Sequence, residues 1–294
     1  MLQARASRRA ILAIALGLTV AAPAFAADGK VAVVAAENIY GDVAAQIGGA
    51  HVAVTSLISN PSQDPHLFEA SPSAVRGVAD ARIVILNGAD YDPWMEKLIK
   101  AAPNAKRAVV SAAAIMGRKP GDNPHLWYDP ATMPRVAEAI ASVLTAADPA
   151  HAADYAANLK TLTDALARID ARVAELRGKY KGRPVTATEP VFGLMAQAIG
   201  LAMRNERFQL AMMNDTEPTA HDLAEFERDL KEKRVKALIY NSQVSEQMTT
   251  RLRDLATAAK IPVVPVTETL PAGMHVQDWV LSELDALDKA LGGQ

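Results

Sequence analysis

A long, regular stripe of apolar residues in the middle of the chain limits the possible folds more than any other feature. The apolar or aromatic positions are separated alternately by four and three residues: Tyr155, Leu159, Leu162, Leu166, Ile169, Val173, Leu176 and Tyr180. This period predicts one continuous helix with a single apolar face. Asp148-Pro149 supplies an N-cap and a first-turn proline, and Gly178, Gly182 and Pro184 mark the end. Roughly 32 residues make a rod of about 48 Å.

The segments on either side of this helix alternate short β-branched runs with helical patterns. Before it we expect strands at 30–35, 52–57, 82–86 and 107–110, and helices at 39–47, 72–78, 93–100 and 131–144. After it we expect strands at 184–188, 235–240 and 262–266, and helices at 190–198, 218–231, 245–258 and 276–291. This rhythm predicts an α/β protein with two lobes, each built on a mainly parallel sheet and bridged by the long helix. A self-contained coiled coil is the alternative use of the stripe, and packing against both lobes is favoured.

Length and composition agree with two lobes and exclude several classes of function. The chain has 294 residues, which suits roughly two domains. It has no cysteine, which excludes disulfides, thiolate metal sites and a cysteine nucleophile. The 31 basic and 33 acidic residues are nearly balanced, so nothing indicates a nucleic-acid partner.

The first 26 residues resemble a secretion signal. Three arginines precede an uncharged apolar stretch at 11–22, and Ala24-Phe25-Ala26 has the small-residue pattern that signal peptidase reads. The stretch is shorter than the roughly 20 residues that a bilayer span needs, so a retained anchor is disfavoured. Ser7-Arg8-Arg9 leaves both the general and the twin-arginine export routes open. With no cysteine at the cleavage site, we expect a protein free in the periplasm without a lipid anchor.

A repeated motif in the first half carries the chemistry. Asp64-Pro65-His66-Leu67-Phe68 recurs as Asn123-Pro124-His125-Leu126-Trp127, each after a predicted strand. The proline stiffens the turn before the histidine, and loops beyond the carboxyl ends of strands line ligand clefts in α/β sheets. A single loop histidine is usually a surface residue, but the repeated setting favours His66 and His125 as metal ligands. The other histidines lack this setting and are interpreted as structural or solvated: His51, His151, His221 and His275.

These two motifs, with the stretch at 87–97 and the long helix, resemble the zinc/manganese-type metal-binding family of solute-binding proteins of ABC transporters. The resemblance covers essentially the whole mature chain. It implies two (β/α) sandwich lobes bridged by one rigid helix, with the metal in the cleft between them. We therefore expect a signal peptide at 1–26, a first metal-binding lobe at 27–147, the linking helix at 148–182 and a second metal-binding lobe at 183–294.

The resemblance also implies two ligands from the second lobe. The third is Glu189 in Thr188-Glu189-Pro190, although an acid there also suits the helix dipole. Glu217 in a second Thr-Glu-Pro tripeptide is the rival, which helix capping explains better. The fourth is Glu268, where the family commonly has Asp, and a solvated loop acid is the alternative. Asn241 cannot supply charge and is interpreted as a residue that holds a ligand in place from behind. The charge cluster at 204–207 could orient Glu189 but reads more simply as solvated.

The implied function is capture of Mn²⁺ or Zn²⁺, with Fe²⁺ less favoured, for delivery to the inner-membrane permease of an ABC importer. Carboxylate ligands and the short segment at 117–122 tilt the expectation slightly towards manganese. We expect a monomer that is not an enzyme and leave open whether a metallochaperone loads it. A metal-dependent hydrolase is the competing class, but no His-Glu-x-x-His helix, Gly-x-Ser-x-Gly elbow or phosphate loop occurs. A surface adhesin on the same fold is the third possibility.

Overall fold

The computed structural model describes residues 29–60, 68, 70–243 and 247–293. The predicted signal peptide and His66 both lie outside these residues. In the part of the chain that is described, no helix combines the length and the apolar character needed to span a membrane.

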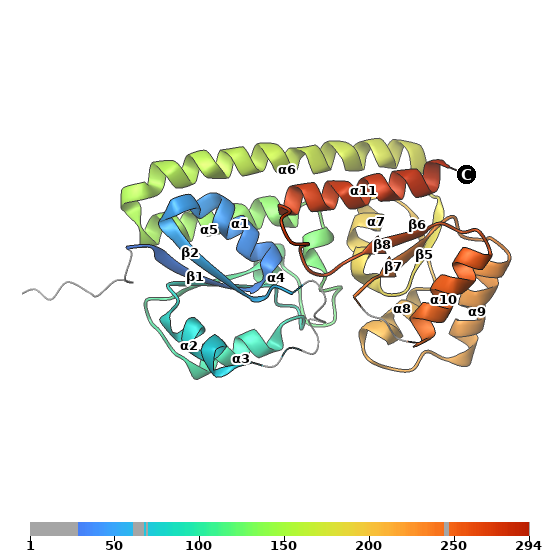
Figure 1. Ribbon diagram of the computed structural model, residues 1–294, viewed down its shortest axis with the longest axis horizontal. Coiled ribbons are helices and arrows are strands. Elements are labelled where there is room, and N and C mark those ends of the chain that lie inside the picture. The colour runs from blue at the N-terminus through green and yellow to red at the C-terminus, as the bar shows by residue number, and fades with distance from the viewer. Residues whose placement is uncertain (1–28, 61–67, 69, 244–246, 294) are drawn as a thin grey trace, which may run out of the picture.

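The first half of the chain forms a four-stranded parallel sheet, ordered β2-β1-β3-β4, with helices on both faces (Figure 1). Residues of β1 alternate between the faces, because Val33 and Ala35 pack with α1 and α5 while Val34 and Ala36 pack with α2 and α3. A strand covered on both faces is apolar throughout, as this one is until Glu37. The elements are β1 (Val31–Glu37), α1 (Asn38–Gly48), β2 (Val52–Ile58), α2 (Pro72–Asp80), β3 (Ile83–Leu86), α3 (Pro93–Ala101), β4 (Ala108–Ser111), α4 (Ala112–Met116) and α5 (Thr132–Ala147).

The second half repeats this topology, with a parallel sheet ordered β6-β5-β7-β8. Its elements are β5 (Pro184–Ala187), α7 (Gly193–Ile199), β6 (Ala202–Arg204), α8 (Glu206–Met213), α9 (Ala220–Lys231), β7 (Leu238–Asn241), α10 (Gln247–Ala258), β8 (Val263–Val266) and α11 (Val276–Gly292). Phe208 and Phe226 pack edge to face beneath one side of the sheet, with Leu238 and Leu252. The predicted α/β class with two parallel sheets is confirmed. All seven predicted strands are present, whereas the short β6 was not predicted.

The predicted rod is helix α6 (Ala152–Tyr180), which runs along both lobes (Figure 1). Every residue of the apolar stripe is buried except Leu159, which is partly buried against the same core. The helix packs against α1 and α5 of the first lobe and against α7 and α11 of the second. The stripe therefore binds both lobes, as expected, and does not form a separate coiled coil.

The start of this rod differs from the prediction. Asp148 does not cap α6 with its side chain, because a 3-10 turn (Pro149–His151) intervenes and His151 is the N-cap residue. The Asp148 carboxylate instead accepts hydrogen bonds from the Tyr155 hydroxyl and from Nδ1 of His151, both at 2.7 Å. The prediction of Asp148 as a side-chain N-cap was wrong because two side-chain donors compete with the backbone N–H groups for the same carboxylate.

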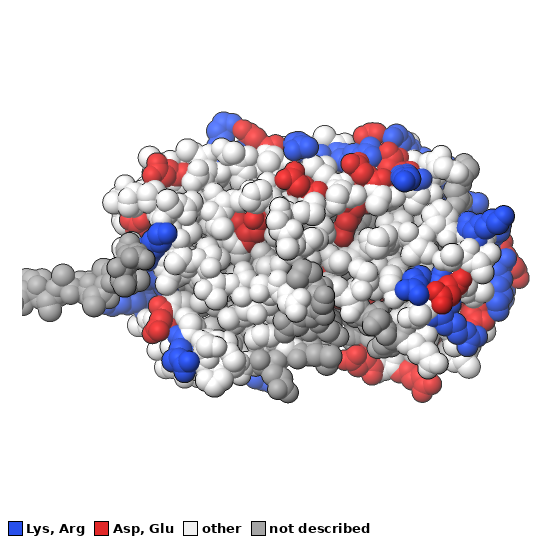
Figure 2. Space-filling model, viewed as in Figure 1, with Lys and Arg blue, Asp and Glu red and all other residues white. Residues whose placement is uncertain are grey.

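Charged side chains gather along the edge formed by α6 and α11 (Figure 2). Arg172 of α6 contacts Asp285 at 2.8 Å and Asp288 at 2.7 Å, both on α11. The Tyr180 hydroxyl donates to Asp288 at 2.5 Å. This bond, helped by Arg172 and Lys179, lowers the pKa of Asp288 to about 2.

We expect Asp288→Asn to lower the free energy of unfolding by about 1–2 kcal/mol at pH 7, after allowance for partial exposure. Because the folded-state pKa of Asp288 is depressed, its contribution is present at neutral pH. It is lost as the pH falls below the ordinary value of 3.8 and through about 2. Urea titrations of both proteins between pH 7 and pH 2 measure the difference. Asp285→Asn is the matched control, because its side chain is 68% exposed and the change should stay within about 0.5 kcal/mol.

Candidate metal centre

The carboxyl ends of the central strands of both sheets carry polar, buried residues. The two central strands are β1 and β3 in the first sheet and β5 and β7 in the second. In each sheet the chain leaves these two strands towards opposite edges of the sheet. Ligands bind at such switch points in open α/β sheets. Glu37 and Asn87 lie at this position in the first lobe, and Glu189 and Asn241 in the second, all with at most 5% exposure.

His125 is fully buried and its ring is oriented by Asn123. The Asn123 amide donates from Nδ2 to the carbonyl oxygen of Pro190 at 2.8 Å, which leaves Oδ1 as an acceptor. That oxygen lies 2.8 Å from Nδ1 of His125, so Nδ1 carries the proton. The Nε2 lone pair is then the available ligand atom, and Nε2 lies 3.4 Å from Oε2 of Glu268. Asn123 therefore aims the imidazole and at the same time joins the first lobe to the residue after Glu189.

Glu268 follows β8 and is fully buried. Its Oε2 accepts a hydrogen bond from the Tyr91 hydroxyl at 2.9 Å, and its Oε1 accepts one from Nδ2 of Asn241 at 2.7 Å. Its backbone N–H donates to the side chain of Gln243. The alternative interpretation of Glu268, as a solvated loop acid, is therefore wrong, because the carboxylate is buried and is hydrogen-bonded by residues of both lobes.

Glu189 lies at the start of a 3-10 turn (Pro190–Phe192) directly after β5, and it is 5% exposed. Its Oε2 accepts from the same Nδ2 of Asn241, at 3.2 Å. One amide group thus holds two carboxylates that come from different strands of the second lobe. The backbone N–H of Asn241 donates to Oγ1 of Thr188 at 3.2 Å, which fixes Asn241 in place.

Tyr91 is a residue of this site that the sequence did not predict. It follows a tight turn in which Gly88, Ala89 and Asp90 all have positive φ, an uncommon conformation for alanine. Asp92 stabilises the turn by accepting from the backbone N–H groups of Asn87 and Gly88, both at 2.7 Å. Burial, followed by the charge of Glu268, raises the pKa of Tyr91 well above its usual value, so its hydroxyl stays a donor.

Two more buried acids lie behind this turn. Burial, followed by the charge of the neighbouring Asp92, raises the pKa of Glu37 well above its usual range. Nδ2 of Asn87 donates to the carbonyl oxygen of Pro124 at 2.8 Å. The polar network of the first lobe therefore supports the backbone that presents His125.

The described residues do not form a complete set of metal ligands. No group of three or more His, Asp or Glu side chains in the described ranges is arranged to hold a metal ion. The structure brings His125 and Glu268 together directly and attaches Glu189 to them through Asn241. His66 lies outside the described residues. The rival Glu217 is exposed in the loop between α8 and α9.

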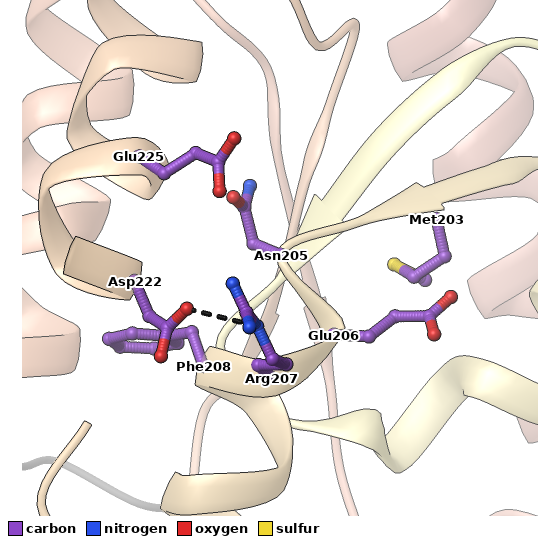
Figure 3. A pocket seen from close by; sticks show the side chains of 7 residues that line it. All are labelled: Met203, Asn205, Glu206, Arg207, Phe208, Asp222 and Glu225. Atoms are coloured by element: carbon purple, nitrogen blue, oxygen red, sulfur yellow. Dashed lines mark ion pairs between the residues drawn. The ribbon is translucent and has the colours of Figure 1, made fainter. Parts of the chain in front are cut away.

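The charge cluster at 204–207 has other partners than Glu189. Arg204 binds the buried carboxylate of Asp229 through two nitrogens, at 2.6 and 3.0 Å. Arg207 pairs with Asp222 at 3.2 Å at the edge of a hollow of about 350 Å³ on the second lobe (Figure 3). The possibility that this cluster orients Glu189 is not supported by these contacts.

Comparison with known proteins places the whole architecture among metal-binding proteins. The family model described as the periplasmic zinc-uptake complex component A matches residues 33–290. The manganese-binding lipoprotein MntA of Bacillus subtilis is 27% identical over 230 residues, covering 75% of this chain and 74% of the relative. The periplasmic zinc-binding protein TroA from Treponema pallidum superposes with a TM-score of 0.75 at 20% identity, covering 90% of this chain and 99% of that one. The Mn²⁺ complex of FpvC from Pseudomonas aeruginosa superposes with a TM-score of 0.73 at 17% identity, covering 90% of this chain and 99% of that one.

Proposed function

Because this chain belongs to the family of periplasmic A components of the zinc-uptake complex, we propose that it captures a divalent transition metal between its lobes and delivers it to an ABC importer. The observation that carries the proposal is the meeting of His125 from the first lobe with Glu268 from the second, 3.4 Å apart in a fully buried position. With Nδ1 of His125 protonated, its Nε2 presents a lone pair to the carboxylate oxygen Oε2 of Glu268. A cation between them satisfies both.

The proposed ligands are His125, Glu189 and Glu268, with His66 as the fourth. Two imidazoles and two carboxylates nearly neutralise a dication, and this set suits Zn²⁺, Mn²⁺ and Fe²⁺. MntA is named for manganese and TroA for zinc. We propose Mn²⁺ or Zn²⁺ as the transported ion.

Several bonds between the lobes limit how the site can open. The Asn38 side chain donates to the carbonyl oxygen of Leu270 at 2.8 Å and accepts from the Leu270 N–H at 2.9 Å. Asp42 accepts from the N–H of Val276 at 2.8 Å, at the first turn of α11. Together with the continuous α6, these contacts favour release of the metal by movement of the ligand-bearing loops, with only a small tilt of the lobes.

The proposed setting follows from the same premise. We propose that the protein works in the periplasm as a monomer and docks on an inner-membrane permease, and that a metallochaperone is a further candidate partner. MntA is named a lipoprotein, so the absence of a lipid anchor on this protein stays a prediction. A hydrolase function has no support among the relatives described above, whose names describe metal-binding proteins.

The decisive experiment is native mass spectrometry with elemental analysis of protein purified from its own periplasm. We expect one equivalent of Zn or Mn on each chain, removable by a chelator and restored by the free ion. Protein that carries no transition metal, and takes up neither ion on addition, would contradict the proposal.

Metal affinity should also depend on pH. Ordinary histidine side chains take up a proton near pH 6.5, and a protonated imidazole cannot bind metal. We expect the affinity for Zn²⁺ or Mn²⁺, measured by calorimetry, to fall between pH 7.5 and pH 5.5 by about tenfold for each histidine ligand. Equal affinities at the two pH values would count against histidine ligation.

A further inference from the structure

The hydroxyl of Tyr128 has two close acceptor-type neighbours but only one proton. Its oxygen lies 2.8 Å from the carbonyl oxygen of Thr267 and 2.6 Å from Oε2 of Glu283. The carbonyl of Thr267 can only accept, so the tyrosine proton is directed there. The short contact to Glu283 is then a hydrogen bond only if the carboxyl group supplies a proton to the phenol oxygen.

The remaining contacts of Glu283 fit a neutral carboxyl group. Its other oxygen, Oε1, accepts from Nε1 of Trp279 at 3.0 Å and from the backbone N–H of Thr267 at 3.3 Å. A carbonyl-type Oε1 with two donors and a hydroxyl-type Oε2 with one acceptor leaves no polar atom of the group unsatisfied. Glu283 is 7% exposed and Tyr128 is fully buried. Burial raises the pKa of Glu283 to about 8.

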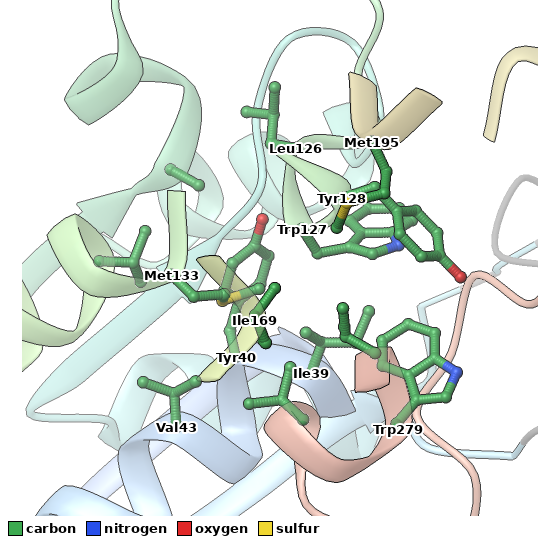
Figure 4. Packing of buried hydrophobic residues seen from close by; sticks show 14 of the residues in the cluster. Ile39, Tyr40, Val43, Leu126, Trp127, Tyr128, Met133, Ile169, Met195 and Trp279 are labelled. Carbon is green, nitrogen blue, oxygen red and sulfur yellow. The ribbon is translucent and has the colours of Figure 1, made fainter. Parts of the chain in front are cut away.

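This hydrogen-bonded group joins the two halves of the proposed metal site. Tyr128 belongs to the 3-10 turn that begins directly after His125, and Thr267 immediately precedes Glu268. Glu283 and Trp279 lie one turn apart on α11. Figure 4 shows Tyr128 and Trp279 among the buried residues, and their ring centroids are 5.5 Å apart. The proton on Glu283 leaves the Tyr128 proton on the carbonyl oxygen of Thr267, and this bond ties the His125 segment of the first lobe to the Glu268 segment of the second.

We propose that Glu283 is a positioning residue that acts as a protonated carboxyl group, holding His125 and Glu268 at their mutual distance so that the site binds metal tightly. This inference rests on the proposed function for its effect on metal, whereas the protonation of Glu283 stands on the hydrogen-bond geometry alone. Loss of the proton places a carboxylate against the Tyr128 oxygen, and the phenol proton must then leave Thr267 to satisfy it.

The charged groups that the structure describes on the elements packed around α11 have other partners than Glu283. On α6, Arg172 and Lys179 pair with Asp288, and Arg168 lies 3.9 Å from Asp278. On α1, Asp42 pairs with His275 at 2.7 Å. After β8, Glu268 adds its charge to the surroundings of Tyr128, and Tyr128 itself is the titratable group in contact with Glu283.

Three variants of the full chain test the proposal, with Zn²⁺ as the probe and a competing chelator to measure affinity. Glu283→Gln keeps an acceptor on one atom and a donor on the other, so we expect its dissociation constant within about threefold of the wild type at pH 7. Tyr128→Phe removes both hydrogen bonds of the phenol and should weaken binding by roughly 10–100-fold, the range for loss of a partner behind a ligand. Glu283→Ala leaves the bond from Tyr128 to Thr267 in place and should weaken binding by a smaller factor. Tyr128→Phe keeps the buried ring, so it serves if the alanine variant folds poorly.

The pH dependence of Zn²⁺ affinity distinguishes a positioning role of Glu283 from a role in packing alone. Between pH 7 and pH 9 the wild type should lose affinity relative to Glu283→Gln, because only the wild type has a proton to lose there. Parallel profiles, or wild-type affinity in Tyr128→Phe, would overturn the proposal.

A metal-free measurement keeps the two hypotheses distinguishable. The infrared difference spectrum of wild type minus Glu283→Gln at pH 7 should contain the carbonyl band of a protonated carboxyl group, and this band should be lost by pH 9. A carboxylate band already present at pH 7 would refute the protonated state. If the wild type binds neither Zn²⁺ nor Mn²⁺, the proposed function fails while the infrared result still decides the state of Glu283.

Discussion

Glu189→Gln and Glu268→Gln should each weaken binding of Zn²⁺ or Mn²⁺ by at least about 100-fold, more than the loss of a residue behind a ligand costs. Each change is nearly isosteric but removes one negative charge from the pair that neutralises the metal. Both carboxylates are buried and both accept from the single amide of Asn241. In the metal-free protein they are like charges in a poorly solvated place, which is destabilising.

The same variants should therefore be as stable as the metal-free wild type or more stable. Weaker metal binding together with equal or higher stability indicates a metal ligand, because substitution of a residue that only supports the fold would lower both the affinity and the stability. Calorimetry with each ion, and thermal unfolding in the presence of a chelator, measure the two quantities. Glu225→Gln on α9 is the control and should change neither. If either site variant binds metal like the wild type, that glutamate is not a ligand.

The sequence was most informative where a pattern repeats over many residues. The stripe on α6 extends over seven turns, and burial on one side confirms it almost residue by residue. The strand β1 was recognisable because both of its faces are covered and the run is apolar up to Glu37. The strand β6 has three residues, Ala202–Arg204, and is too short to show any period.

The site could be predicted only in part. His125 was predicted as a ligand because its Pro-His-Leu-aromatic motif occurs twice, and the two glutamates were predicted by resemblance to a family; all three stay predictions. Tyr91 was not predicted because its position depends on Ala89 and Asp90 both adopting positive φ, a conformation that is uncommon for alanine. Glu283 did leave a signal. It lies four residues from both Trp279 and Leu287, on the buried face of α11, where an acid needs a partner or a proton.

The second large effect concerns the imidazole. We expect His125→Ala to weaken metal binding by at least about 100-fold and Asn123→Ala to weaken it by about 10–100-fold, because Asn123 only holds the ring that His125 presents. His125→Ala should also remove part of the pH dependence between pH 7.5 and pH 5.5, since one proton-binding ligand is gone. Calorimetric titrations of both variants at these two pH values give the ranking and the change in slope.

His221→Ala on α9 is the matched control, because its side chain is 69% exposed. It removes an imidazole from the same chain without touching the interlobe contacts, so both its affinity and its pH dependence should equal those of the wild type. The order of the three variants is what the structure requires. Asn123 contacts His125 and Pro190, and through them both lobes, so an Asn123 effect larger than the His125 effect would mean that the joint between the lobes, and not the imidazole, governs binding.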